Sequence, residues 1–184
     1  MSTGATCARR PTIALIGIRG CGKTTVGRQL ATILGGDLLD TDARIVQLAG
    51  KSIAAIFVEE GEAGFRRRER EVISRISADP PAVVSVGGGA VLDDHNVETL
   101  RRTATVVWLT APVETLWERI RGDETTAASR PPLTDRPGLK ELEHLLSARA
   151  SVYARAADFT VDTTGRTPLQ VAEVILKELD TGTH

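Results

Sequence analysis

The chain has 184 residues, of which 41% are hydrophobic and 26% are charged, and its formal net charge is −1. This length and composition predict one globular domain over residues 1–184, and the lack of a basic excess argues against a nucleic-acid partner. No apolar run reaches the length of a membrane span, and Cys7 and Cys21 make neither a disulfide framework nor a metal site, so we expect a reduced, cytoplasmic protein without a membrane partner.

Short apolar strands alternate with longer amphipathic stretches along the sequence, which is the pattern of a parallel α/β sheet. The predicted strands are residues 12–18, 37–40, 82–86, 105–109 and 159–161. The predicted helical segments are residues 23–35, 41–77, 94–102, 112–121, 139–155 and 167–179. We therefore expect five parallel strands flanked by helices. Residues 122–138 contain three prolines and show no hydrophobic period, which predicts a mobile loop over the site.

A glycine-rich segment, residues 17–24, lies between the first predicted strand and the first predicted helix. Its pattern of Gly, four residues, Gly, Lys and Thr is that of a phosphate-binding loop, in which backbone N–H groups and the helix N-terminus surround an anion. Lys23 is placed to reach the β- and γ-phosphates, and the Thr24 hydroxyl is a ligand for Mg²⁺. An ordinary turn is the alternative, but a chance match in such a chain is on the order of one in a hundred. The segment therefore predicts nucleotide binding.

Two later strands also end in residues that suit a ligand, and ligands of open α/β sheets bind at the carboxyl ends of the strands. Asp40 and Asp42 close the second strand, where one carboxylate suits Mg²⁺ and the other an acceptor hydroxyl. A helix N-cap is the alternative for either aspartate. Gly87, Gly88 and Gly89 close the third strand, where they make either a tight turn or a place for a ligand to touch the backbone.

Arginines in two places suit anionic ligands. Arg66, Arg67 and Arg68 form a run in a predicted helix; such a run is commonly a solvated face, but a planar guanidinium is also the best fork for a carboxylate. Arg130 lies in the predicted loop 122–138. It is either an unattached loop residue or an arginine finger that reaches the γ-phosphate when the loop closes.

Together these features resemble the shikimate kinase family along nearly the whole chain. The matching residues are 17–24, 39–42, 50–53, 56–57, 61–62, 65–66, 69, 87–90, 130–131, 149 and 153. The resemblance implies a P-loop NTPase three-layer sandwich with a five-stranded parallel sheet. In it, residues 12–35 would form the phosphate loop and first helix, 41–78 the shikimate-binding region and 122–138 the lid. It also implies transfer of the γ-phosphoryl group of ATP to the 3-hydroxyl of shikimate, a step in chorismate and aromatic amino-acid biosynthesis.

The resemblance further implies roles for individual residues. Catalysis would involve Lys23, Asp42 and Arg130, with Asp42 on the acceptor hydroxyl. ATP would contact Gly20, Cys21, Gly22, Lys23, Thr24, Thr25, Arg121, Arg130 and Pro168, with Arg119 as the alternative to Arg121. Shikimate would contact Asp42, Arg66, Gly87, Gly88, Gly89 and Arg149, and the two arginines would clamp its carboxylate. Thr24 and Asp40 would organise one Mg²⁺ ion.

Two other functions have to be weighed against this reading. A gluconate kinase-like enzyme also uses a phosphate loop and a lid, but the arginine pair and the three glycines favour shikimate. A nucleotide-dependent switch would hydrolyse nucleotide without a small acceptor; a GTPase of that kind usually shows an Asn-Lys-x-Asp segment, which this sequence does not contain. We expect ATP and shikimate to be its small-molecule partners. We also expect the chain to act as a monomer.

Overall fold

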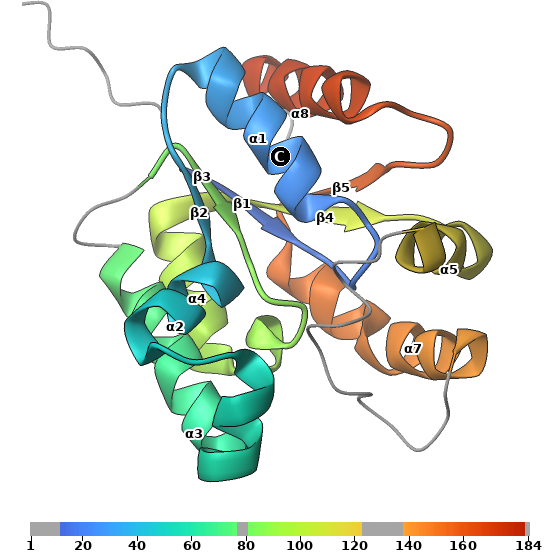
Figure 1. The fold of residues 1–184 in the computed structure, drawn as a ribbon. Coiled ribbons are helices and arrows are strands. Elements are labelled where there is room, and N and C mark those ends of the chain that lie inside the picture. Colours follow the sequence, from blue (N-terminus) through green and yellow to red (C-terminus); the bar gives the residue numbers. More distant parts are fainter. Residues whose placement is uncertain (1–11, 77–80, 123–137, 183–184) are drawn as a thin grey trace, which may run out of the picture.

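The centre of the structure, a computed structural model that describes residues 12–76, 81–122 and 138–182, is a parallel sheet of five strands (Figure 1). The strands lie in the order β2-β3-β1-β4-β5. Their bounds are Thr12–Ile16 for β1, Leu38–Asp40 for β2, Val83–Ser85 for β3, Ala104–Thr110 for β4 and Phe159–Asp162 for β5. The predicted five-stranded parallel sheet is therefore confirmed, with each strand within two residues of its expected ends.

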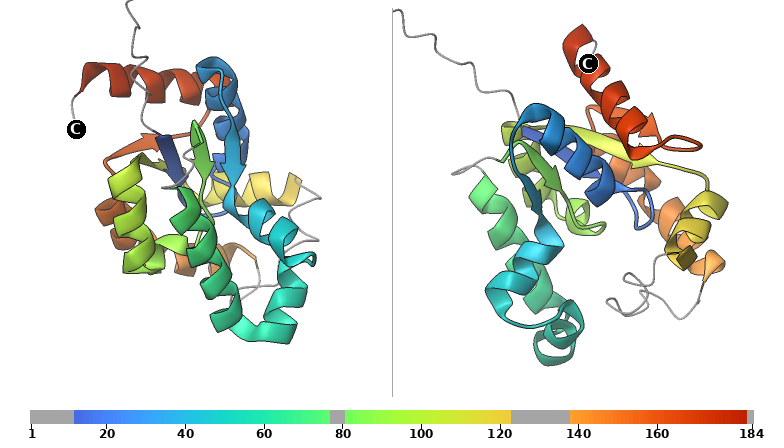
Figure 2. Two further views of the ribbon diagram at one scale, coloured as in Figure 1. Left: turned by 90° about the vertical axis from the view of Figure 1, so that its left-hand side faces the viewer. Right: turned by 45° about the horizontal axis from the view of Figure 1, so that its top comes forward.

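Helices cover both faces of this sheet and make the predicted three-layer sandwich. Their bounds are Lys23–Leu34 for α1, Thr41–Ala49 for α2, Ile53–Ile76 for α3, Asp94–Thr103 for α4, Val113–Gly122 for α5, Leu139–Ala156 for α7 and Pro168–Thr181 for α8, with a 3-10 turn η1 at Ala90–Leu92. Helices α1 and α8 lie side by side on one face, whereas α4 and α7 cover the other (Figures 1 and 2). Helices α2 and α3 project beyond the β2 side of the sheet (Figure 2).

The central strands β1 and β3 are largely apolar because helices cover the sheet on both faces. All five residues of β1 are buried, and so are all three of β3. In a parallel strand that is buried on both faces, side chains on both sides contact the core. Its sequence is therefore a nearly continuous hydrophobic segment rather than an alternation of polar and apolar residues. Parallel pairing of β3 with both β1 and β2 places the carboxyl ends of these three strands beside one another, and the loops that follow them build the site.

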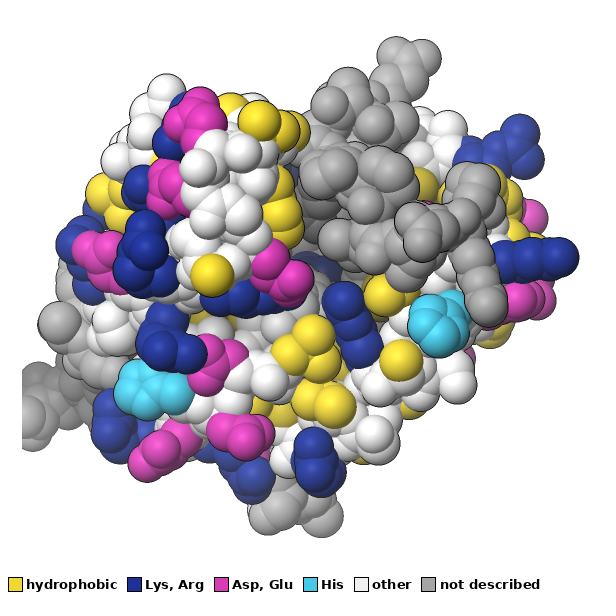
Figure 3. Space-filling view, turned by 90° about the horizontal axis from the view of Figure 1, so that it is seen from below, with side chains coloured by type: hydrophobic (Ala, Val, Ile, Leu, Met, Phe, Trp, Pro, Cys, Tyr) yellow, Lys and Arg dark blue, Asp and Glu magenta, His cyan; other side chains and the backbone are white. Residues whose placement is uncertain are grey.

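Helix α3 is kinked at Gly61, whose φ of 68° and ψ of −177° interrupt the helix. At the kink, the Glu60 carboxylate accepts hydrogen bonds from Arg68 and Arg67 and pairs with Lys51. Hydrogen bonds from Arg68 and then Lys51 lower the pKa of Glu60 to about 2, so it stays ionised. On the face of the molecule seen in Figure 3, basic and acidic side chains are interspersed. The bend lets both halves of α3 line one cleft, as described below.

Asp93 joins α3 to the start of α4. Its Oδ1 atom accepts a hydrogen bond from the backbone N–H of His95, and its Oδ2 atom accepts two from Arg70, at 3.0 and 2.5 Å. Partial burial raises the pKa of Asp93, but the hydrogen bonds from Arg70 and the backbone outweigh burial and hold the pKa below its ordinary value. The ionised carboxylate is therefore favoured in the folded protein.

Replacing Asp93 with Asn should keep the helix cap but lower the free energy of unfolding by about 0.5–1 kcal/mol at neutral pH, because Arg70 loses its partner near the surface. Since folding lowers the pKa of Asp93, its contribution is present above the ordinary value of 3.8 and is lost as the pH falls through the folded-state pKa. Urea unfolding of the unsubstituted protein and of Asp93→Asn at several pH values measures this difference in the free energy of unfolding. A difference that stayed constant down to strongly acidic pH would contradict the assignment.

Part of the predicted organisation lies outside the described residues. Of the predicted lid, residues 122–138, only Gly122 and Gly138 are described, and Arg130 is not. The lid and the role of Arg130 therefore stay predictions. Among the described helices, none combines the length and the apolar character that crossing a bilayer requires.

Candidate active site

Two clefts open at the carboxyl ends of the strands. The larger has a volume of about 470 Å³, and the smaller, about 80 Å³, lies between α3, α7 and the loop after β3. The large cleft is lined chiefly by residues 19–26, Asp40, Asp42, Ser85, Val86, Arg119, Ile120, Thr163, Arg166, Pro168 and Val171. The small cleft is lined by Ile18, Arg19, Asp42, Ile53, Phe57, Phe65, Arg66, Glu69, Gly87, Gly88, Gly89 and Arg149. Asp42 and Arg19 belong to both clefts, which therefore adjoin.

The loop after β1 wraps around the floor of the large cleft and leads into α1. Gly20 and Gly22 have φ values of 83° and 94°, which residues with a side chain rarely adopt, and a Cβ atom on Gly20 would lie 2.8 Å from the Leu116 carbonyl oxygen. The Lys23 ammonium group donates hydrogen bonds to the carbonyl oxygens of Gly17, at 2.8 Å, and Ile18, at 3.2 Å. The loop thus has the shape and the positive charge that an anion needs.

Three oxygen atoms gather at the base of the large cleft. The Thr24 hydroxyl donates to Asp40 Oδ2 at 2.8 Å and lies 3.2 Å from the Ser85 hydroxyl. Asp40 Oδ1 meanwhile accepts from the backbone N–H groups of Asp42 and Ala43 and caps α2. The N-cap and the ligand interpretations of Asp40 are therefore compatible, because each uses a different oxygen. Sequence reasoning missed Ser85, although the parallel register pairs it with Asp40.

The far end of the large cleft is built from α5, α8 and the loop after β5. Pro168, the first residue of α8, lines it together with Arg119. The Arg119 guanidinium donates to the hydroxyl and the carbonyl oxygen of Thr163, both at 2.9 Å. Arg121 is exposed and is not among the lining residues. The helical register of α5 therefore favours Arg119, the alternative from the sequence, over Arg121 at this position.

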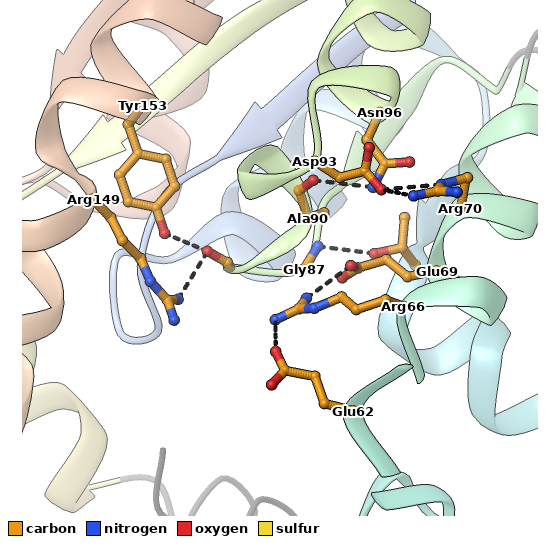
Figure 4. A network of polar contacts seen from close by, with 12 residues as sticks. Glu62, Arg66, Glu69, Arg70, Gly87, Ala90, Asp93, Asn96, Arg149 and Tyr153 are labelled. Carbon is orange, nitrogen blue, oxygen red and sulfur yellow. Dashed lines mark hydrogen bonds and ion pairs between the residues drawn. The ribbon is translucent and has the colours of Figure 1, made fainter. Parts of the chain in front are cut away.

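Arg66 is the member of the arginine run that lines the small cleft. Its guanidinium donates to Glu69 at 2.8 Å and to Glu62 at 3.2 Å (Figure 4). Burial raises the pKa of Glu69, whose side chain is 1% exposed, and the hydrogen bond from Arg66 opposes that rise. Arg67 and Arg68 instead pair with Glu60 on the outside of the kink. Among the three arginines, Arg66 lines the small cleft, whereas Arg67 and Arg68 are paired with Glu60 and do not line it.

The three glycines after β3 leave room for the functional side chains themselves. A Cβ atom on Gly87 would lie 2.8 Å from Asp42 Oδ1, and one on Gly89 would lie 2.7 Å from an Arg66 nitrogen. The Gly87 N–H donates to the Thr41 hydroxyl at 2.9 Å, which fixes the start of the turn. A side chain at Gly87 or Gly89 would therefore force the end of Asp42 or Arg66 to move from its present position beside the turn.

Helix α7 approaches the same turn from the opposite side. Arg149 Nη1 and the Tyr153 hydroxyl both donate to the Gly88 carbonyl oxygen, at 3.2 and 2.5 Å (Figure 4). Nearer the start of α7, Glu141 pairs with Arg19 of the loop after β1 at 2.9 Å. Arg66 and Arg149 therefore lie on opposite sides of the small cleft, carried by α3 and α7.

The structure brings most of the predicted site residues together. The large cleft is lined by Gly20, Cys21, Gly22, Lys23, Thr24, Thr25, Asp40, Asp42 and Pro168, and the small cleft by Asp42, Arg66, Gly87, Gly88, Gly89 and Arg149. Arg121 lies outside both clefts, and Arg130 lies outside the described residues. Arg19, Ser85, Glu69 and Tyr153 were missed as site residues. Arg19, Ser85 and Tyr153 make their contacts with elements that are distant in sequence, whereas Glu69 pairs with Arg66 three residues away in α3.

The family model for shikimate kinase matches residues 19–180 of the chain. Shikimate kinase from Symbiobacterium thermophilum is 45% identical over 168 residues, which are 91% of this chain and 95% of that protein. Shikimate kinase from Thermobifida fusca is 45% identical over 170 residues, 92% of this chain and 95% of that one. The structure of shikimate kinase from Acinetobacter baumannii in complex with shikimate matches with a TM-score of 0.86 and 36% identity over 94% of each chain. The chain thus belongs to the shikimate kinase family.

Proposed function

We propose that this chain transfers the γ-phosphoryl group of ATP to the 3-hydroxyl of shikimate. The observation that supports the proposal most is the junction of the two clefts at Asp42: one cleft contains a phosphate-binding loop, and the other contains two arginines that suit a carboxylate. Direct phosphoryl transfer requires donor and acceptor to be held in line and in contact, so adjoining sites are what the reaction needs. The relatives' names favour this function over a gluconate kinase-like enzyme or a nucleotide switch.

The base of the large cleft fits a magnesium ion. The Thr24 hydroxyl, Asp40 Oδ2 and the Ser85 hydroxyl are hard oxygen donors that lie together. A single carboxylate with hydroxyls suits Mg²⁺, which keeps several waters and takes further ligands from phosphates. Thr24 and Asp40 would hold the ion, directly or through water. When bound, it neutralises charge on the β- and γ-phosphates.

The remaining residues of the large cleft suit the rest of ATP. Lys23 now donates to two loop carbonyl oxygens, and we propose that it turns to the β- and γ-phosphates when ATP binds. Residues 20–25 would surround the phosphates through their backbone. Arg119 and Pro168 would enclose the adenine at the far end of the cleft.

The small cleft suits a small hydroxylated carboxylate. Arg66 and Arg149 face it from opposite sides, and two guanidinium groups bind a carboxylate more firmly than one. Asp42 lies where the clefts join, so it would hold the acceptor hydroxyl and take its proton during transfer. The stacked rings of Phe57 and Phe65, with centres 5.0 Å apart, form an apolar wall for the acceptor ring.

Release of ADP from Mg-ATP, measured with shikimate, gluconate or quinate as the added acceptor, tests the proposed function. Strong stimulation by shikimate alone, with phosphate recovered on shikimate, is the expected result. Release that is indifferent to every acceptor would instead support a nucleotide switch and overturn the substrate assignment.

Replacing Arg149 with Leu should raise the KM for shikimate by about 10- to 100-fold and leave the KM for ATP nearly unchanged, because one charge-assisted hydrogen bond of about 1.5–3 kcal/mol to the acceptor is lost. Calorimetric titration of shikimate into the variant measures the effect directly. Arg155→Leu, an exposed residue of the same helix, is the matched control and should bind normally. Unchanged shikimate affinity in Arg149→Leu would make Arg149 a purely structural residue.

Four predictions from the sequence remain part of this proposal. They are the closure of residues 122–138 as a lid, the placement of Arg130 on the γ-phosphate, the monomeric state and the cytoplasmic location.

A further inference from the structure

We propose that Tyr153 is a positioning residue for the acceptor: its hydroxyl fixes the Gly88 peptide so that the turn after β3 presents its backbone N–H groups to shikimate. The inference rests on the proposed function, because it concerns the cleft assigned to shikimate. Tyr153 does not line that cleft, so its role would be exerted through Gly88, which does.

The Gly88 carbonyl oxygen accepts two hydrogen bonds from α7. The Tyr153 hydroxyl donates at 2.5 Å and Arg149 Nη1 at 3.2 Å, so both lone pairs of the oxygen are engaged (Figure 4). In a trans peptide the N–H of the next residue points opposite to the carbonyl. The Gly89 N–H therefore points away from α7. Within the described parts of the chain, the N–H groups of Gly88 and Gly89 donate to no protein acceptor.

Tyr153 is itself held rigidly, which is what a positioning residue requires. Its side chain is fully buried, and its ring stacks on that of Trp108 in β4, with centres 5.7 Å apart. Gly88 is confined from the other direction, since a Cβ atom there would lie 3.3 Å from the Gly17 carbonyl oxygen in the phosphate loop. The turn is therefore fixed between α7 and the loop that binds phosphate. Arg149 alone would hold it less well, because that guanidinium also has to bind the acceptor.

The hydroxyl acts as a hydrogen-bond donor and takes no part in proton transfer. Burial raises the pKa of Tyr153 to about 12, so the group stays protonated and able to donate wherever the enzyme is active. Any loss caused by removing the hydroxyl should consequently be independent of pH between about 6 and 9, well below that pKa. An acid–base role would instead change the shape of the pH–rate profile.

The test compares Tyr153→Phe with Thr12→Val. Phenylalanine keeps the ring and its packing on Trp108 but removes the donor to Gly88. Thr12→Val removes a similar long-range hydroxyl-to-carbonyl hydrogen bond, 2.7 Å to Pro81, at the opposite end of the sheet from the clefts. For Tyr153→Phe we expect the KM for shikimate to rise about 3- to 10-fold, as one neutral hydrogen bond is lost, with the KM for ATP unchanged. Thr12→Val should change neither KM.

Thermal unfolding of both variants shows whether they fold, and steady-state kinetics with each substrate varied in turn gives the two KM values. An unchanged KM for shikimate in Tyr153→Phe, or equal rises in both KM values, would overturn the proposal and leave Tyr153 as a core residue. A loss that varies with pH across the neutral range would also overturn it. Failure of the proposed function is distinguishable, because the unsubstituted protein would then show no shikimate-dependent ADP release.

Discussion

Replacing Lys23 with Ala is expected to abolish phosphoryl transfer, with kcat falling at least about 10²- to 10³-fold, the loss typical for removing one preorganised group that stabilises transition-state charge. The ammonium group is the one lysine charge in the described lining of the large cleft, and it lies on the loop that would surround the phosphates. Shikimate binding should persist, since Lys23 does not line the small cleft. Coupled measurement of ADP release, together with calorimetry for shikimate, checks both statements.

The fold should persist in this variant, although Gly17 and Ile18 lose the ammonium donor from their carbonyl oxygens. Circular dichroism and thermal unfolding test this point. Lys177→Ala, an exposed lysine of α8, is the control for removing a lysine charge and should retain full activity. Near-normal turnover in Lys23→Ala would refute the assignment of residues 17–24 as the catalytic phosphate loop.

Replacing Asp42 with Asn should reduce kcat by about 10²- to 10⁴-fold, the usual contribution of a positioned general base. Asp42 is the carboxylate that lines both clefts, and its Oδ1 atom lies so close to Gly87 that a Cβ atom there would be 2.8 Å away. Asparagine preserves the shape and can still hydrogen-bond the acceptor, but it cannot take the proton. The affinity for ATP should therefore change little, and single-turnover transfer from bound ATP should show the loss.

Asp94→Asn provides the matched control, because Asp94 is an acidic residue in the first turn of α4, as Asp42 is in the first turn of α2, but it is exposed and lines neither cleft. Its activity should equal that of the unsubstituted protein. If Asp42→Asn lost activity only through a large rise in the KM for ATP, Asp42 would belong to the nucleotide site and would not be the base.

The features that the sequence predicted well depend mainly on residues that are close together in the sequence. The phosphate loop is one continuous segment whose glycines sit between a buried strand and a helix, so its conformation follows from local backbone preferences. Strands β1 and β3 were recognisable because strands that are buried on both faces are predominantly apolar. Asp40 and Gly87 to Gly89 were located because parallel strands bring their carboxyl ends to one edge of the sheet, whatever the details of packing.

Other features were decided by contacts between elements that are distant in sequence. The identity of the cleft-lining arginine in residues 66–68 depends on the bend at Gly61 and on Glu60, which engages the other two. The preference for Arg119 over Arg121 depends on which side of α5 faces Thr163, a residue 44 positions away.

By itself, then, the sequence determined the sheet, the phosphate loop and the set of residue types at the site, because short-range preferences and burial periods are encoded locally. The tertiary structure decided that Asp40 both caps α2 and bonds Thr24, that Ser85 joins them, and that Tyr153 holds Gly88. Each of these contacts depends on the relative placement of packed helices and strands. That placement results from side chains filling a common core, and no single stretch of sequence contains it.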